Sequence, residues 1–210
     1  SITTSFKPGS GITFDGGDEW HLNIRNAFQV GFLHTTGDGA STNNFSIRRA
    51  RTRLSGHAFD EDLTYRVEVD WVAGSAVDAV DAWTQWNFYK DEENGNIGVR
   101  LGLTKQLFGR EFTGDYEGLA FINRSISDRT FNGNRSLGAM LVGDHMDGRL
   151  QWNFGLFNQG AALLASDTAI NGTTPFGSRA APNDGNELAY IIGVNFNVIS
   201  DVPDGRGRED

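Results

Sequence analysis

The 210-residue sequence contains no cysteine and only four prolines. Without cysteine, the chain can form neither a disulfide framework nor a thiolate metal site. Glycine, by contrast, is plentiful with 27 residues, and each glycine inside a helix costs about 1 kcal/mol relative to alanine. The composition therefore disfavours a helical protein.

Long apolar runs and an excess of basic residues are also missing. No segment approaches the roughly 20 apolar residues that a transmembrane helix needs. The first residues, Ser1 to Thr4, lack the basic and then apolar pattern of a signal peptide, so we expect a mature, processed or truncated chain. The net charge of −9 argues against nucleic acid as a partner. A membrane β-barrel is not excluded, because only alternate residues of its strands face lipid.

The sequence does contain apolar and polar residues in two-residue alternation, repeated many times. Between Trp20 and Phe32 the even positions are mostly large and apolar, whereas the odd positions are mostly polar or small. Further strands are expected in residues 46–56, 64–71, 81–88, 97–104, 137–141, 149–156 and 188–198. The pattern leaves open which face of the 137–141 segment is apolar. In total it predicts about eight strands, mostly about ten residues or longer, which is the length that a tilted membrane-spanning strand needs.

The connections between these expected strands alternate in length. The short, polar ones are residues 60–62, 90–96 and 144–148. The others, which are on average longer, are residues 35–44, 73–79, 105–135 and 158–187. Short turns on one rim and long loops on the other are typical of bacterial outer-membrane barrels. We therefore predict an all-β fold, a transmembrane antiparallel up-and-down β-barrel, with residues 1–210 in a single domain.

A soluble β-sandwich, such as a glycan-binding domain, is the alternative, because its strands also alternate with one face buried. Sandwich strands are typically about five or six residues long, which is shorter than the strands expected here. Trp20, Trp71, Trp86 and Tyr190 lie near the ends of the apolar faces, where membrane barrels carry their aromatic girdles. Strand length and aromatic placement favour the membrane barrel.

Several segments resemble the phosphate-selective porin O and P family of Gram-negative outer membranes. Residues 46–56 (SIRRARTRLSG) resemble the double-arginine strand of the family, and residues 63–71 (LTYRVEVDW) resemble the tyrosine-bearing strand paired with it. Further similar segments are residues 81–83, 99–105, 108–111, 121–125, 134–138 and 150–158. The similarity runs through most of residues 12–160, in the order and spacing of the family.

The resemblance implies a water-filled diffusion channel of the outer membrane, assembled as a homotrimer, for small polar or anionic solutes such as phosphate. It implies neither enzymatic activity nor a cofactor. Family members are roughly twice this length and form sixteen-stranded barrels, and residues 201–210 lack the terminal aromatic residue that such barrels commonly carry. We therefore expect the N-terminal half of a barrel, incomplete at its C-terminus. The alternative function is a non-conducting barrel that serves as an anchor or interaction partner.

Six arginines fall on strand faces that the family pattern places in the lumen. They are Arg25, Arg49, Arg51, Arg53, Arg66 and Arg100. We expect them to line the pore and bind anions, because guanidinium groups present planar donors to phosphate or carboxylate oxygens. Alternatively, they pair with acids of neighbouring strands and balance the charge of the wall. The acids in question are Glu68, Asp70 and Asp81.

Residues 105–135 form the candidate constriction loop, since the third loop of family members folds into the lumen and narrows it. Connections of this length usually have a function of their own. The residues expected to line the constriction are Lys105, Arg110, Tyr116, Arg124, Arg129 and Arg135. A role in subunit contacts is the alternative for this segment.

Catalytic and metal-binding patterns are weak. The four histidines, His21, His34, His57 and His145, are spread along the chain, and no zinc, EF-hand or phosphate-loop spacing is present. His21 and His57 fall on faces expected to point into the lumen. We predict no catalytic residues and no metal site.

Overall fold

The computed structural model describes residues 2–37, 40–73, 76–91, 95–107, 114, 125, 135–158 and 188–196. These residues form ten strands and one short 3-10 helix. The elements are β1 (Thr3–Lys7), β2 (Gly11–Asp15), η1 (Gly17–Glu19), β3 (Trp20–Gly37), β4 (Ala40–Ala58), β5 (Asp60–Ala73), β6 (Ala76–Asp91), β7 (Gly95–Lys105), β8 (Arg135–His145), β9 (Leu150–Asn158) and β10 (Leu188–Phe196).

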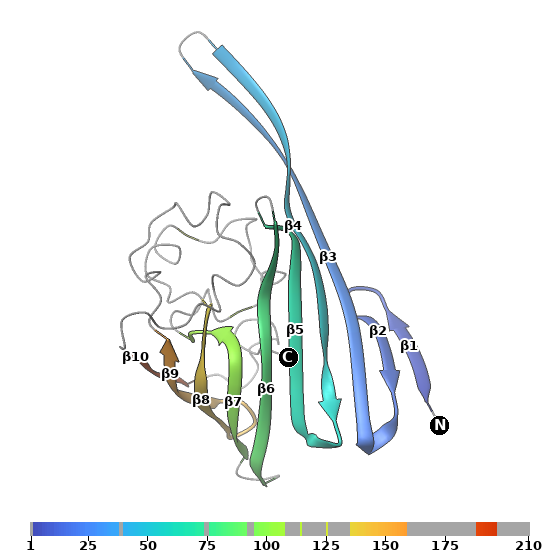
Figure 1. The fold of residues 1–210 in the computed structure, drawn as a ribbon, viewed down its shortest axis with the longest axis vertical. Coiled ribbons are helices and arrows are strands. Elements are labelled where there is room, and N and C mark those ends of the chain that lie inside the picture. The colour runs from blue at the N-terminus through green and yellow to red at the C-terminus, as the bar shows by residue number, and fades with distance from the viewer. Residues whose placement is uncertain are drawn as a thin grey trace.

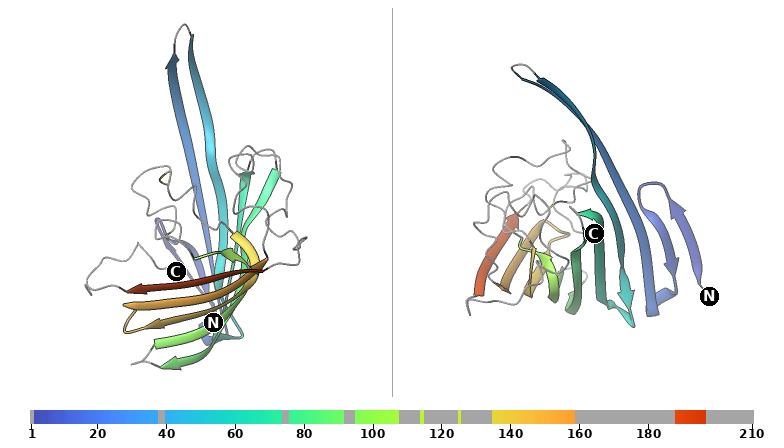
Figure 2. Two further views of the ribbon diagram at one scale, coloured as in Figure 1. Left: turned by 90° about the vertical axis from the view of Figure 1, so that its left-hand side faces the viewer. Right: turned by 45° about the horizontal axis from the view of Figure 1, so that its top comes forward.

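The ten strands form one antiparallel sheet in the order β1 to β10, so each strand pairs with its neighbours in sequence. Figure 1 and Figure 2 show this sheet as a strongly curved wall, with the β3–β4 hairpin rising well beyond the other strands. Curvature of this kind follows from the right-handed twist of paired strands. The prediction of an all-β, up-and-down architecture is confirmed. None of the described helical residues belongs to a helix long and apolar enough to cross a membrane.

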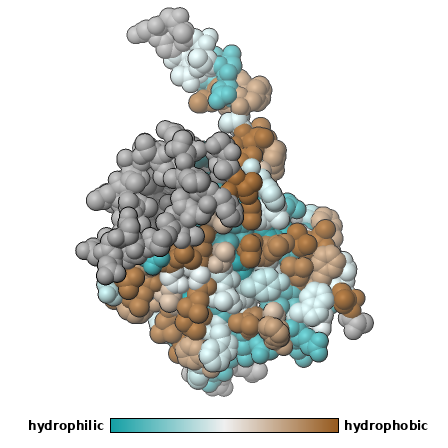
Figure 3. Space-filling view, in the orientation of Figure 1, coloured by the Kyte–Doolittle hydropathy of each residue, from teal (hydrophilic) through white to brown (hydrophobic). Residues whose placement is uncertain are grey.

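The two-residue alternation separates the sheet into an outer apolar face and an inner polar face. On β3 and β6, side chains such as Phe28 and Trp86 are more than half exposed, while Asp81 and Asn87 are buried. Figure 3 shows brown, apolar areas spread over the strands below the protruding hairpin. Apolar side chains exposed in such numbers suit contact with lipid chains rather than water.

The strand predicted with an ambiguous face, β8, is assigned by its register with β7. Met140 lies opposite Arg100 and Ser136 lies opposite Thr104, so both share the inner face with these polar residues. Leu137, Ala139 and Leu141 consequently face outward. The sequence was ambiguous because Met140 and Val142 put apolar side chains on the inner face as well.

Several expectations about strands and loops differ from the structure. The expected connections 73–79 and 90–96 are partly strand, since β6 runs from Ala76 to Asp91 and β7 begins at Gly95. The expected count was about eight strands, and the structure adds β1 and β2, which are only five residues long and show little alternation. The expected long loop 35–44 is instead mostly strand, since β3 continues to Gly37 and β4 begins at Ala40. Polar side chains hid this extension, because a two-stranded ribbon standing clear of the sheet has no buried face to alternate. The expected turn 60–62 lies inside β5.

A β-bulge marks the base of the protruding hairpin. Gln29 pairs with Arg49 and Val30 pairs with Ile47, so Arg48 is the extra residue of β4. Arg48 is exposed. Such a bulge bends the strand and increases its local twist, and the hairpin departs from the wall here.

The turn between β4 and β5 is tighter than the sequence indicated. Phe59 reverses the chain with a φ of 71°, a conformation that non-glycine residues rarely adopt. The carboxylate of Asp60 then accepts hydrogen bonds from the backbone N–H groups of Asp62 (2.9 Å) and Leu63 (3.1 Å). This Asx-type arrangement replaces the loop that residues 60–62 were expected to form.

Gly56 provides a test of the strand packing, because Tyr65 lies opposite it and reaches across to β3. The Tyr65 hydroxyl donates to the carbonyl oxygen of His21 at 3.3 Å, and a Cβ at position 56 would collide with that same carbonyl oxygen. We expect Gly56→Ala to lower the free energy of unfolding by about 1–3 kcal/mol, as overpacking does. Urea unfolding of the protein folded in detergent, followed by tryptophan fluorescence, measures this change.

Gly31→Ala on the same hairpin is the matched control. A Cβ there would meet nothing nearer than the Ser46 side chain at 3.4 Å, an ordinary contact. Equal destabilisation by the two substitutions would contradict the packing described for Gly56.

Candidate functional site

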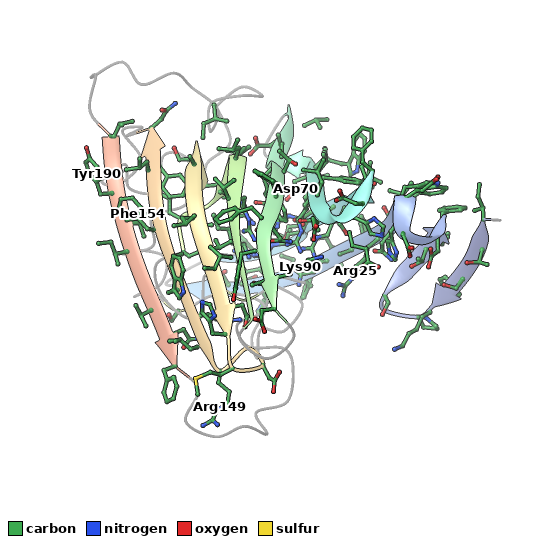
Figure 4. All side chains as sticks on the ribbon, turned by 90° about the horizontal axis from the view of Figure 1, so that it is seen from below. Arg25, Asp70, Lys90, Arg149, Phe154 and Tyr190 are labelled. Atoms are coloured by element: carbon green, nitrogen blue, oxygen red, sulfur yellow. The ribbon has the colours of Figure 1, made fainter. Side chains whose placement is uncertain are left out.

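The register of β4 and β5 brings basic and acidic side chains together on the inner face. Arg51 lies opposite Asp70, and Arg53 lies opposite Glu68. Because residues two apart on a strand share a face, Arg49 joins this group from the same strand. Figure 4 shows nitrogen and oxygen atoms gathered around Asp70 and toward Arg25.

Glu68 is the centre of the resulting ion-pair network. Its carboxylate accepts from Arg53 Nε at 2.7 Å and from Arg51 Nη1 at 3.0 Å. Arg51 Nε also donates to Asp70 Oδ2 at 2.8 Å. The Glu68 side chain has no exposed surface, and Arg53 is only 5% exposed. Glu68 therefore ties two arginines of β4 to the wall by hydrogen bonds between charged groups, which are the stronger kind.

Glutamine side chains orient two further arginines. Arg49 Nη1 donates to Gln29 Oε1 at 2.6 Å, and Arg100 Nε donates to Gln85 Oε1 at 2.9 Å. The amide of Gln85 is itself fixed, since its Nε2 donates to Asn87 Oδ1 at 2.7 Å. An amide oxygen directs a guanidinium group without adding a negative charge.

Trp83 lies on the inner face between two arginines. The guanidinium carbon of Arg100 is 4.1 Å from the centre of the Trp83 ring, and that of Arg66 is 5.4 Å away. Both distances are within the range of a cation–π interaction. Trp83 therefore holds two positive charges close together on the wall.

Two cations lie at the strand ends that border the candidate constriction loop. Lys105, the last residue of β7, is buried, and its Nζ donates to the carbonyl oxygen of Gly114 at 3.4 Å. Arg135, the first residue of β8, binds Asp81 on β6, with Nε 2.9 Å from Oδ1. Arg135 thus ties the C-terminal end of the segment to β6, and Lys105 contacts Gly114 within the segment itself.

The structure brings together most of the residues that the sequence singled out. Arg49, Arg51, Arg53, Arg66 and Arg100 all contribute to the inner face, and Arg25 lies opposite Arg53 in the register. The alternative of pairing with acids holds for Arg51 and Arg53. Asp81 pairs with Arg135, which was expected in the loop. Arg110, Tyr116, Arg124 and Arg129 lie outside the described residues.

The roles of Trp83, Gln29 and Gln85 were missed from the sequence. The signal for Trp83 was its position among the polar residues of β6, because a tryptophan is not expected on a polar strand face. No comparable signal marks a glutamine that orients an arginine, because glutamine is expected on any polar face.

The inner cluster has an excess of positive charge. We define this cluster by eight cationic and four acidic residues: Arg25, Arg49, Arg51, Arg53, Arg66, Arg100, Lys105 and Arg135, with Glu68, Asp70, Asp78 and Asp81. Arrays of arginine on a channel wall favour anions. Among the described residues, no group of three or more acidic or histidine side chains is arranged to hold a metal ion.

Glu68 is expected to be essential for stability because it is a buried carboxylate shared by two arginines. Replacing Glu68 with Gln removes the charged partner of the buried Arg53 and one of the two acids that Arg51 contacts, and breaking a buried pair in this way costs about 3–5 kcal/mol. Urea unfolding of the detergent-folded protein measures the loss.

The control variant is Asp62→Asn, which removes the exposed ion pair between Asp62 and Lys90. Exposed pairs contribute at most about 1 kcal/mol, so this variant is expected to unfold close to the wild type. A Glu68→Gln variant as stable as Asp62→Asn would show that the network contributes little.

The comparison with known families agrees with the architecture. No curated protein is significantly similar to the chain. The family model described as phosphate-selective porin O and P matches residues 21–186, which include all the strands from β4 to β9 and nearly all of β3. Because this match covers most of the chain, and the strands form the antiparallel up-and-down sheet of a porin, the chain belongs to the phosphate-selective porin O and P family.

Proposed function

We propose that the protein forms a water-filled channel in the outer membrane of a Gram-negative bacterium and favours small anions such as phosphate. The observation that carries this proposal is the division of one sheet into an exposed apolar face and an inner face with a cationic cluster. Membership of a porin family supports the same function. Outer-membrane lipid is the expected partner of the apolar face, and the family resemblance implies assembly as a homotrimer.

The expected anion preference is moderate because acids offset part of the cationic cluster. Glu68 and Asp70 bind Arg51 and Arg53 directly, which lowers the positive potential near these two arginines. Arg49 and Arg100 donate hydrogen bonds to glutamine side chains, and an amide oxygen orients a guanidinium group without adding a negative charge.

Residues 105–135 are proposed as the constriction loop. The support comes from its two ends, where Lys105 reaches Gly114 and Arg135 reaches Asp81. The contact of Arg135 with Asp81, which lies on the inner face, supports this proposal. The cations at its ends add to the positive potential of the wall.

Planar-bilayer recording tests the channel and its selectivity. In a potassium chloride gradient, the wild type is expected to give stepwise currents with a reversal potential displaced toward that of chloride. Replacing Arg49, Arg51 and Arg53 together with Ala removes three positive charges and is expected to shift the reversal potential toward that of potassium. Asp70→Asn is expected to shift it in the opposite direction.

Each outcome has a clear meaning. Absence of current steps from folded protein would favour a non-conducting anchor and contradict the channel. A reversal potential that stays unchanged in the triple variant would assign the three arginines to the structure of the wall.

Trp83 allows a second test, because a tryptophan of the same strand serves as its control. Trp83→Leu removes the aromatic ring between Arg66 and Arg100, and we expect the single-channel conductance or the anion preference to change by a measurable fraction. Trp86→Leu changes an outward-facing, exposed side chain and is expected to leave both quantities unchanged. Equal effects of the two variants would contradict a pore-lining role for Trp83.

A further inference from the structure

Two of the four histidines lie side by side on the inner face, near the short turns. His21 of β3 is the register partner of His57 of β4. Their ring centres are 5.7 Å apart and their planes differ by 33°. They share a face with Arg25 and Arg53 but lie four residues away from them along each strand. The two histidines therefore do not belong to the inner cluster.

One nitrogen of this pair is buried without a hydrogen-bond partner. The Nδ1 atom of His57 is inaccessible to solvent and makes no hydrogen bond. A neutral imidazole keeps one nitrogen unprotonated, and that lone pair either accepts a hydrogen bond or binds a metal ion. Since buried polar atoms are normally satisfied, the histidine pair has a binding capacity that the protein itself does not use.

The separation of the rings suits a shared metal ion. Nitrogen–metal bonds of about 2.0–2.1 Å place the centres of two imidazoles bound to one ion about 4.5–6.3 Å apart, depending on the bond angle at the metal. The observed 5.7 Å lies within this interval. Small rotations of the side chains therefore suffice, and the backbone register can stay as it is.

The immediate surroundings also favour a cation. Asp15 of β2 is the register partner of His21 and faces the same side of the sheet. Its carboxylate accepts a hydrogen bond from the backbone N–H of Gly17 at 2.7 Å and so stays near the histidine pair. On the other side, His57 faces the uncharged Thr64 of β5.

We propose that His21 and His57 bind a divalent transition-metal ion on the inner wall of the channel. Imidazole ligands favour copper, nickel and zinc over magnesium and calcium, which prefer oxygen ligands. Two protein ligands leave the remaining coordination positions to water. The site is separate from the inner cluster, so this proposal does not rest on whether the channel conducts anions.

Isothermal titration calorimetry on the detergent-folded protein tests the site. We expect one Cu²⁺ to bind per chain, more tightly than Zn²⁺, in the order that affinities for nitrogen ligands follow. Mg²⁺ is expected to give no binding. His21→Asn and His57→Asn are each expected to weaken Cu²⁺ binding by at least about tenfold.

Two matched variants control for the other histidines. His34 lies on the protruding hairpin with its Nδ1 2.6 Å from Asn43 Oδ1, and His145 stacks on Trp152. His34→Asn and His145→Asn should therefore bind Cu²⁺ as tightly as the wild type. Circular dichroism and the unfolding midpoint of each variant separate the loss of a ligand from the loss of the fold.

Two results would overturn the proposal. One is a wild type that binds no Cu²⁺ at micromolar to millimolar concentration. The other is a folded His21→Asn or His57→Asn variant that keeps wild-type affinity. Neither result would alter the currents on which the proposed channel function is tested, so the two proposals fail independently.

Discussion

Backbone hydrogen bonding is the constraint on which the rest of this structure depends. Within a bilayer no water is present to satisfy N–H and C=O groups, so the strands of a sheet that crosses one must satisfy them by pairing with each other. Pairing each strand with its sequence neighbours satisfies these groups at low cost in loop entropy. Successive side chains of each paired strand point to opposite faces of the sheet, and the outward positions have to be apolar. All functional chemistry is thereby confined to the inward positions and the connections.

That confinement explains why charges are packed so closely on the inner face. Arg49, Arg51 and Arg53 on one strand would repel one another if β5 did not supply Glu68 and Asp70 at the matching register positions. Glu68 therefore stabilises the arrangement and moderates its charge at the same time. Trp83 and the glutamines contribute in another way, because they orient guanidinium groups while leaving the positive charge in place. The same side chains thus affect both stability and selectivity. The acids neutralise part of the positive charge of the arginines, and the neutral groups orient the guanidinium groups.

The sequence predicted those features that follow from periodicity. The existence of the strands β3 to β10 could be predicted from alternation, which is local in the chain, whereas the inward position of six arginines was predicted from the family pattern. Pairing between strands is not a local property of the chain. Whether Arg51 binds anions or forms an ion pair could therefore be decided only from the register. Phe59, with its positive φ, and the extension of β3 to Gly37 gave no periodic signal. The short strands β1 and β2 were missed because five residues contain too few alternations to recognise.

The protruding hairpin makes the rim of the wall uneven. With 18 residues at about 3.3 Å each, β3 is about 60 Å long, roughly twice the thickness of the hydrocarbon core of a bilayer. Even a tilted strand of this length reaches beyond such a core, and Phe32 and Phe45 are exposed beyond the bulge. The two rings contact each other, with centres 4.7 Å apart, and shield part of their surfaces from water. The wall therefore has unequal height, and the β3–β4 hairpin projects from it as a stiff two-stranded ribbon (Figure 1).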